Sequence, residues 1–122
     1  MTAYLINHLR IPGDVPNAEG LTYLEKVEAT FKPYGGKWLA LGPHDEVLEG
    51  AWAGSVVLME FPDLQTAKQW YSSPEYQEIL GLRTNNAISD LILVNEVAGD
   101  FSSADYARQV RAAIADAASA SV

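Results

Sequence analysis

Four short segments of the chain carry the side-chain pattern of β-strands, and these segments are 3–11, 37–42, 55–61 and 88–97. Successive residues of a strand point to opposite sides. The first segment therefore places Leu5, Asn7 and Leu9 on one face, and His8 and Arg10 on the other. The third segment is apolar on both faces over most of its length, which predicts a central strand.

Between the first two strands, apolar residues recur at steps of three and four, the period of an amphipathic helix. The predicted helix begins near Asn17 or Ala18, and Pro33 loosens its last turn because proline lacks a backbone donor. Gly35 and Gly36 then end the helix as a C-cap. Its predicted apolar stripe consists of Leu21, Leu24, Val27, Phe31 and Tyr34.

A second helical region follows the third strand, and the sequence predicts that it is broken. Asp63 is a candidate N-cap for the first piece. Ser73 and Pro74 interrupt the region and suit the N-cap and the first turn of a second piece. The residues of that piece spaced for one side are Tyr76, Ile79, Leu80 and Arg83.

The order of elements is β-α-β-β-α-β, followed by a further helix. This order predicts an α+β fold of ferredoxin-like plan, with a four-stranded antiparallel sheet and helices on one face. We expect residues 1–99 to form the ferredoxin-like domain and residues 100–122 a C-terminal helical extension. The extension begins with a cap at Ser102 or Ser103 and continues as an alanine-rich helix to about Ala118.

The face of the sheet without helices requires a cover, since the third and fourth strands leave no fully polar face. Val56, Leu58 and Ile92 are apolar on one face, while Val57 and Leu93 are apolar on the other. A second copy of the chain supplies a matching apolar face, so the sequence predicts a homodimer. The competing cover is the C-terminal helix, whose apolar stripe is Tyr106, Val110 and Ile114.

Composition reduces the number of functional classes to consider. The formal net charge is −8 in 122 residues, which disfavours nucleic acid and anionic membranes as partners. The chain contains no cysteine, so a disulfide scaffold, a thiol nucleophile and a cysteine metal site are excluded. Without a signal-peptide pattern or an apolar run long enough to span a bilayer, we expect a cytoplasmic protein.

Two segments carry a family resemblance: Tyr34-Gly35-Gly36-Lys37-Trp38-Leu39 and Trp70-Tyr71-Ser72-Ser73-Pro74-Glu75-Tyr76. Between them stand Glu46-Val47-Leu48-Glu49-Gly50 and Glu60-Phe61-Pro62 in the same order. From about Ala3 to Val97 the chain resembles the family known as domain of unknown function 1330. The resemblance implies a ferredoxin-like fold assembled as a dimeric α/β barrel. Barrels of this kind include cofactor-independent monooxygenases, heme-degrading enzymes and muconolactone-isomerase-like proteins, and fold analogy alone does not choose among them.

The two histidines are the candidate titrating groups. His8 lies within a strand and is a candidate acid or base because its reference pKa lies near neutrality; the alternative is a hydrogen-bonded structural histidine. His44 lies in a predicted turn, where it is either catalytic or a solvated turn residue. Neither histidine stands in a metal-ligand spacing, so we predict no metal. No phosphate loop or dinucleotide motif is present, so we predict no cofactor.

A ligand pocket is predicted between the sheet and the broken helix. The candidate lining residues are Tyr34, Trp70 and Tyr76, and the alternative is that these rings only fill the core. Arg83 follows on the same helical piece and can pair with a carboxylate of a ligand. Its alternative partner within the chain is Glu49 or Glu60.

Two functions remain open at this stage. The first is a small-molecule-binding protein, or a cofactor-independent enzyme, for an aromatic or polyketide-like acid. The second is a non-catalytic dimerisation or stress-related module. A cleft lined by polar and aromatic groups favours the first function, and a filled interior favours the second.

Overall fold

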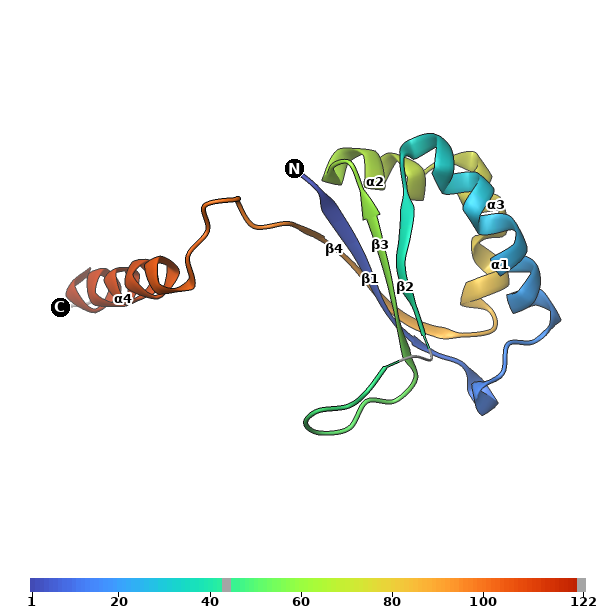
Figure 1. Ribbon diagram of the computed structural model, residues 1–122, viewed down its shortest axis with the longest axis horizontal. Coiled ribbons are helices and arrows are strands. Elements are labelled where there is room, and N and C mark those ends of the chain that lie inside the picture. Colours follow the sequence, from blue (N-terminus) through green and yellow to red (C-terminus); the bar gives the residue numbers. More distant parts are fainter. Residues whose placement is uncertain (43–44, 121–122) are drawn as a thin grey trace.

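The computed structural model describes residues 1–42 and 45–120. One antiparallel sheet carries helices on a single face, and a last helix stands apart (Figure 1). The strands are β1 (Ala3–Arg10), β2 (Lys37–Leu41), β3 (Ser55–Phe61) and β4 (Ile88–Asn95). The helices are α1 (Ala18–Phe31), α2 (Leu64–Tyr71), α3 (Pro74–Thr84) and α4 (Ser103–Ala120), with short 3₁₀ turns at Pro12–Asp14 and Lys32–Tyr34.

The strands lie in the order β2-β3-β1-β4 and every neighbouring pair is antiparallel. The predicted α+β ferredoxin-like fold and the central position of the third strand are therefore confirmed. In the register of β1, Leu5 lies between Met59 of β3 and Leu93 of β4. The face that carries these residues points toward α1, α2 and α3, and we call it the inner face.

Each of the three helices that cover the sheet has an N-cap side chain at the position that the sequence predicts. The Asn17 side chain accepts a hydrogen bond from the Gly20 amide at 3.0 Å and caps α1. Asp63 caps α2 by accepting from the Thr66 amide at 2.7 Å. Ser73 caps α3, which separates α3 from α2 at the predicted break. Each cap satisfies a backbone donor that the first helical turn leaves unpaired.

The predicted apolar stripe of α1 is wrong in its first half. Val27 and Phe31 are buried, but Leu21 and Leu24 remain 48% and 40% exposed. Tyr23 packs against the core instead. The reason is helix phase: Tyr23 and Val27 are one turn apart and turn their shared face to the sheet, which leaves Leu24 at the edge of that face.

The described part of the segment between β2 and β3 is irregular. Residues 45–54 form a loop without helix or strand. Gly54 closes this loop with a φ of +82°, and a Cβ atom there would overlap the Leu9 carbonyl oxygen. The loop therefore returns to β3 at a position that only glycine occupies without strain.

The core lies between the inner face and the helices. Its largest fully buried side chains are Trp70, Tyr76, Phe31, Phe61 and Val27. The Trp70 ring lies 5.2 Å from Phe61 and 4.2 Å from Tyr76, measured between ring centroids. These contacts join the sheet to both pieces of the broken helix.

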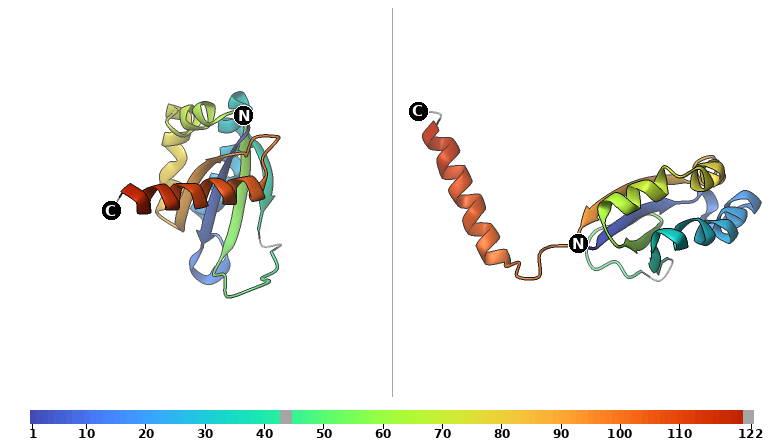
Figure 2. Two further views of the ribbon diagram at one scale, coloured as in Figure 1. Left: turned by 90° about the vertical axis from the view of Figure 1, so that its left-hand side faces the viewer. Right: turned by 90° about the horizontal axis from the view of Figure 1, so that it is seen from above.

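Over the described residues, no helix covers the outer face of the sheet, where the Trp52 ring of the loop before β3 lies against His8 of β1. Ile92 and Val94 of β4 are exposed there, and α4 stands away on this side of the sheet (Figures 1 and 2). Every residue of α4 is solvent-exposed, so α4 does not cover its own sheet. In the described ranges, no helix combines the length and apolar character needed to cross a membrane.

Candidate functional site

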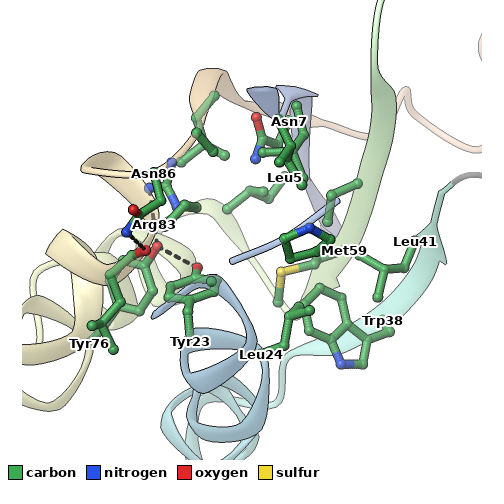
Figure 3. A pocket seen from close by; sticks show the side chains of 18 of the residues that line it. Leu5, Asn7, Tyr23, Leu24, Trp38, Leu41, Met59, Tyr76, Arg83 and Asn86 are labelled. Carbon is green, nitrogen blue, oxygen red and sulfur yellow. Dashed lines mark hydrogen bonds between the residues drawn. The ribbon is translucent and has the colours of Figure 1, made fainter. Parts of the chain in front are cut away.

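A small cavity lies between the inner face and helices α1 and α3 (Figure 3). Its volume is about 80 Å³, and exposed Leu24 and Leu41 stand at its edge. Most of the wall is apolar. The polar side chains on it belong to Asn7, Asn17, Tyr23, Tyr76, Arg83 and Asn86.

Asn7 is the polar residue of the sheet floor. It follows the inward alternation of β1 between Leu5 and Leu9, and its side chain is only 3% exposed. Its Nδ2 donates a long hydrogen bond of 3.4 Å to Ser89 Oγ. Its Oδ1 is buried and has no partner in the described part of the chain. An unpaired buried acceptor costs about 1–3 kcal/mol, so this atom is a place where a donor is missing.

Three polar groups form a chain on the helical wall. Arg83 Nη2 of α3 donates to the Tyr76 hydroxyl at 3.3 Å, and this hydroxyl lies 2.9 Å from the Tyr23 hydroxyl of α1 (Figure 3). The Arg83 guanidinium also lies over the Tyr23 ring, 5.9 Å from its centroid. These hydrogen-bonded groups thus join α1 to α3 across the helical side of the cavity.

This wall holds more hydrogen-bond donors than acceptors. The two phenols carry two hydrogens, and their mutual bond uses only one of them. Arg83 has five donor hydrogens and is buried. Over the described ranges no carboxylate lies within 4.0 Å of its guanidinium, and Glu60, one of its predicted partners, pairs with Lys37 instead. The wall therefore carries a buried positive charge without a carboxylate partner in the described ranges.

Tyr23 remains a neutral phenol in this setting. Burial raises the pKa of Tyr23 well above its ordinary value, and the neighbouring Tyr76 hydroxyl raises it further. The nearby Arg83 cation opposes this shift without reversing it. Tyr23 can therefore donate a hydrogen bond across the physiological pH range, whereas a phenolate base at this position is disfavoured.

The structure brings together three of the four residues predicted to bind a ligand. Trp70, Tyr76 and Arg83 all line the cavity. Tyr34 is partly buried against the core but lies outside the cavity wall. The reason is the 3₁₀ turn Lys32–Tyr34, which follows the end of α1 and carries Tyr34 past it.

The predicted titrating residue His8 does not join this group. His8 points to the outer face, opposite the cavity, because it alternates with Asn7 along β1. Its ring stacks on Trp52 with 4.2 Å between centroids, and its Nε2 donates to the Ala53 carbonyl at 2.6 Å. His44 lies outside the described residues.

Sequence reasoning missed Asn7 and Tyr23 as site residues. Asn7 carried a signal, since it is a lone polar residue among leucines on one strand face. Tyr23 carried none, because it falls beside the apolar stripe that the spacing suggested.

The described residues offer no metal centre. Within residues 1–42 and 45–120, no three His, Asp or Glu side chains come together in a group that could hold a metal ion. The polar groups on the cavity wall are phenols, amides and a guanidinium.

Fold and cavity together define an α+β protein of ferredoxin-like plan, with a small and mostly apolar pocket beneath its helices that also carries aromatic and polar side chains. The chain belongs to the family described as domain of unknown function (DUF1330), whose model matches residues 2–97. The match ends before α4, which is additional to the family domain. None of the curated proteins matches the chain significantly.

Solved structures confirm the fold at low sequence identity. The RPA0582 protein of unknown function from Rhodopseudomonas palustris is 19% identical, with a TM-score of 0.61 over 80% of this chain and 83% of that one. SnoaB, a cofactor-independent oxygenase from Streptomyces nogalater, is 14% identical, with a TM-score of 0.59 over 83% and 98%. An antibiotic biosynthesis monooxygenase is 14% identical, with a TM-score of 0.50 over 80% and 100%.

Proposed function

We propose that this protein binds an aromatic or polyketide-like acid in the cavity and acts on it without a cofactor. The observation that carries the proposal is Arg83, a buried guanidinium that has no carboxylate partner in the described ranges. A buried charge without a counter-charge is costly, and an anionic ligand removes that cost. The guanidinium fork suits a carboxylate, which it can bind through two hydrogen bonds.

The walls of the cavity support an aromatic ligand. Trp70 and Trp38 contribute ring surface, and Leu5 and Met59 contribute apolar surface from the sheet. Pockets of this kind, mostly apolar with a few convergent polar groups, are typical of small-molecule sites. The anion would sit at the helical wall and the ring would lie against the sheet.

Two fold neighbours support the enzymatic half of the proposal. SnoaB is described as a cofactor-independent oxygenase, and another neighbour as an antibiotic biosynthesis monooxygenase. At 14% identity these likenesses concern the fold, so catalysis here rests on the experiment below.

A second candidate is a non-catalytic dimerisation or stress-related module. The observation in its favour is the size of the cavity, because about 80 Å³ is less than the roughly 150 Å³ that holds one benzene ring in a dry engineered cavity. A ligand ring must then displace wall side chains or project past exposed Leu24 and Leu41.

Binding of benzoate and naphthoate, measured by calorimetry with the neutral amides as controls, tests the function. We expect the acids to bind and the amides to bind at least 10-fold more weakly. Arg83→Gln should remove that preference. Arg10→Gln is the matched control and should keep it, because Arg10 lies on the outer face in an ion pair with Asp90. Absence of acid binding at millimolar concentration in the folded wild type would contradict the proposal.

Catalysis is tested separately by incubating a bound acid with the protein in air and following it by mass spectrometry. Turnover that Arg83→Gln abolishes identifies an enzyme. Unchanged ligand after many hours identifies a binding protein.

The proposed assembly is a homodimer in which two outer faces meet. Ile92 and Val94 leave exposed apolar surface there, and α4 leaves this face uncovered. A two-fold partner would bury the same surface on both chains. Light scattering of the full chain should give twice the mass of one chain.

A further inference from the structure

The cavity has two polar ends of opposite hydrogen-bond character. The helical wall offers donors through Arg83 and the tyrosine pair, whereas the sheet floor offers an unpaired acceptor, Asn7 Oδ1. Leu5 of β1 and Met59 of β3 add apolar side chains to the lining of the cavity. A ligand that satisfies both ends must carry an acceptor for the wall and a hydrogen-bond donor for the floor.

We propose that the ligand of this cavity is an aromatic acid that also carries a hydroxyl group, donated to Asn7 Oδ1. This inference rests on the proposed function and adds a second recognition group to it. The acid group would meet Arg83 and the free phenol hydrogen of the Tyr23–Tyr76 pair. The hydroxyl would meet the sheet floor, and the ring between the two groups would displace side chains of the cavity wall, because about 80 Å³ is less than one ring requires.

The burial of Asn7 supports the interpretation that its free oxygen is part of a ligand-binding site. Its side chain is 3% exposed, and Ser89 engages only the Nδ2 end of the amide. In this orientation Nδ2 faces Ser89, and Oδ1 is the end of the amide left for a ligand. A donor on the ligand therefore meets an acceptor that solvent reaches poorly, the condition under which a missing hydroxyl is strongly discriminated.

A hydroxyl is the donor that best fits the remaining constraints. The cavity has a volume of about 80 Å³, so a group of one heavy atom on a ring fits more readily than a bulky one. A second cationic donor, such as an ammonium, would place a charge in the same small cavity as Arg83, where like charges repel. The predicted class is therefore a phenolic or enolic acid.

The probes are benzoate, its three hydroxy isomers and their methyl ethers, titrated into the full-length protein by calorimetry. We expect one hydroxy isomer to bind at least 10-fold more tightly than both benzoate and its own methyl ether. The ether keeps the oxygen but cannot donate, so it isolates the hydrogen bond. Using all three isomers removes any assumption about the spacing between floor and wall.

Two variants assign the preference to Asn7. Asn7→Leu should reduce the hydroxy-to-methoxy ratio to about 1 while benzoate still binds, which also reports that the variant is folded. Ser89→Ala leaves Oδ1 in place and should retain the preference. Arg83→Gln should weaken all probes together.

The outcomes separate the two proposals. Equal affinity of wild type for benzoate and every hydroxy isomer, with Arg83 still required, would overturn the hydroxyl inference and leave the aromatic-acid site intact. Preference for a hydroxy isomer that persists in Asn7→Leu would also overturn it. If no acid binds at all, the proposed function itself is wrong.

Discussion

Replacing Asn7 by leucine should make the protein more stable, although it removes a polar residue that makes a hydrogen bond. The unpaired Oδ1 costs the folded state about 1–3 kcal/mol, and its removal recovers that free energy. The lost hydrogen bond to Ser89 is long, at 3.4 Å, and is worth about 0.5–1.5 kcal/mol. Burial of the leucine side chain adds up to about 1.5–3 kcal/mol, reduced by any crowding.

The net expectation is a gain of about 1–3 kcal/mol in the free energy of unfolding. For a chain of this length that corresponds to a rise in melting temperature of roughly 4–12 °C. Urea titration followed by tryptophan fluorescence measures the change, at one fixed protein concentration because the proposed dimer would make stability depend on concentration. A stabilised variant that no longer prefers hydroxylated acids would show that Asn7 is kept for binding at the expense of stability.

Asn86→Leu is the matched control, since Asn86 lines the same cavity but is satisfied. Its amide donates to the Leu82 carbonyl at 2.9 Å, and its Oδ1 accepts from Asn17 at 2.6 Å. This variant should lose about 1–2 kcal/mol. If Asn7→Leu is destabilised as much as Asn86→Leu, then Asn7 Oδ1 has a partner in solution, such as a bound water, and the reasoning from an unpaired acceptor is refuted.

Three further predictions concern the rest of the chain. The hydrogen bond from the Thr66 amide lowers the pKa of the Asp63 carboxyl. Its capping contribution to stability is therefore present near neutrality and is lost as pH falls through that lowered pKa. In urea titrations, the stability advantage of wild type over Asp63→Asn should shrink between about pH 5 and pH 2. Gly54→Ala should cost more than about 2 kcal/mol because φ is +82° and the Cβ meets backbone, whereas Gly50→Ala, with φ +76° in open space, should cost about 1 kcal/mol. Ile92, on the outer face, is 58% exposed, and Ile92→Asp should give monomers by light scattering. The control Val15→Asp, away from the sheet, should not change the mass. A dimeric Ile92→Asp variant would contradict sheet-to-sheet assembly.

The fold could be predicted because its signals are local. Asp63 and Ser73 are N-cap residues whose effect depends on the next three residues, and both cap helices as expected. Gly35 takes a left-handed conformation, with φ +72°, at the end of the turn that follows α1. Strand alternation likewise depends only on neighbours along the chain.

The site could be predicted only in part because it depends on which face of the sheet the helices cover. Alternation separated Asn7 from His8, but nothing in β1 itself says which of the two faces inward. The even-numbered face offered a histidine and attracted the functional hypothesis, yet the helices cover the odd-numbered face. Arg83 could be predicted as a site residue because it lies about two helical turns after Tyr76 on the same short helix and therefore on the same side.

The break between α2 and α3 determines how the aromatic wall is assembled. In one continuous helix, six residues advance the side chain by about 600°, which would turn Tyr76 roughly 120° away from Trp70. The interruption at Ser72–Ser73 resets that rotation, so the two rings pack 4.2 Å apart on one wall. From Tyr76 to Arg83 the helix is unbroken, and seven residues return the side chain to nearly the same direction. A dipeptide with no side chain on the cavity wall thus sets the relative orientation of the tryptophan, the tyrosine and the arginine, and an insertion or deletion of one residue there would rotate half of the wall out of the pocket.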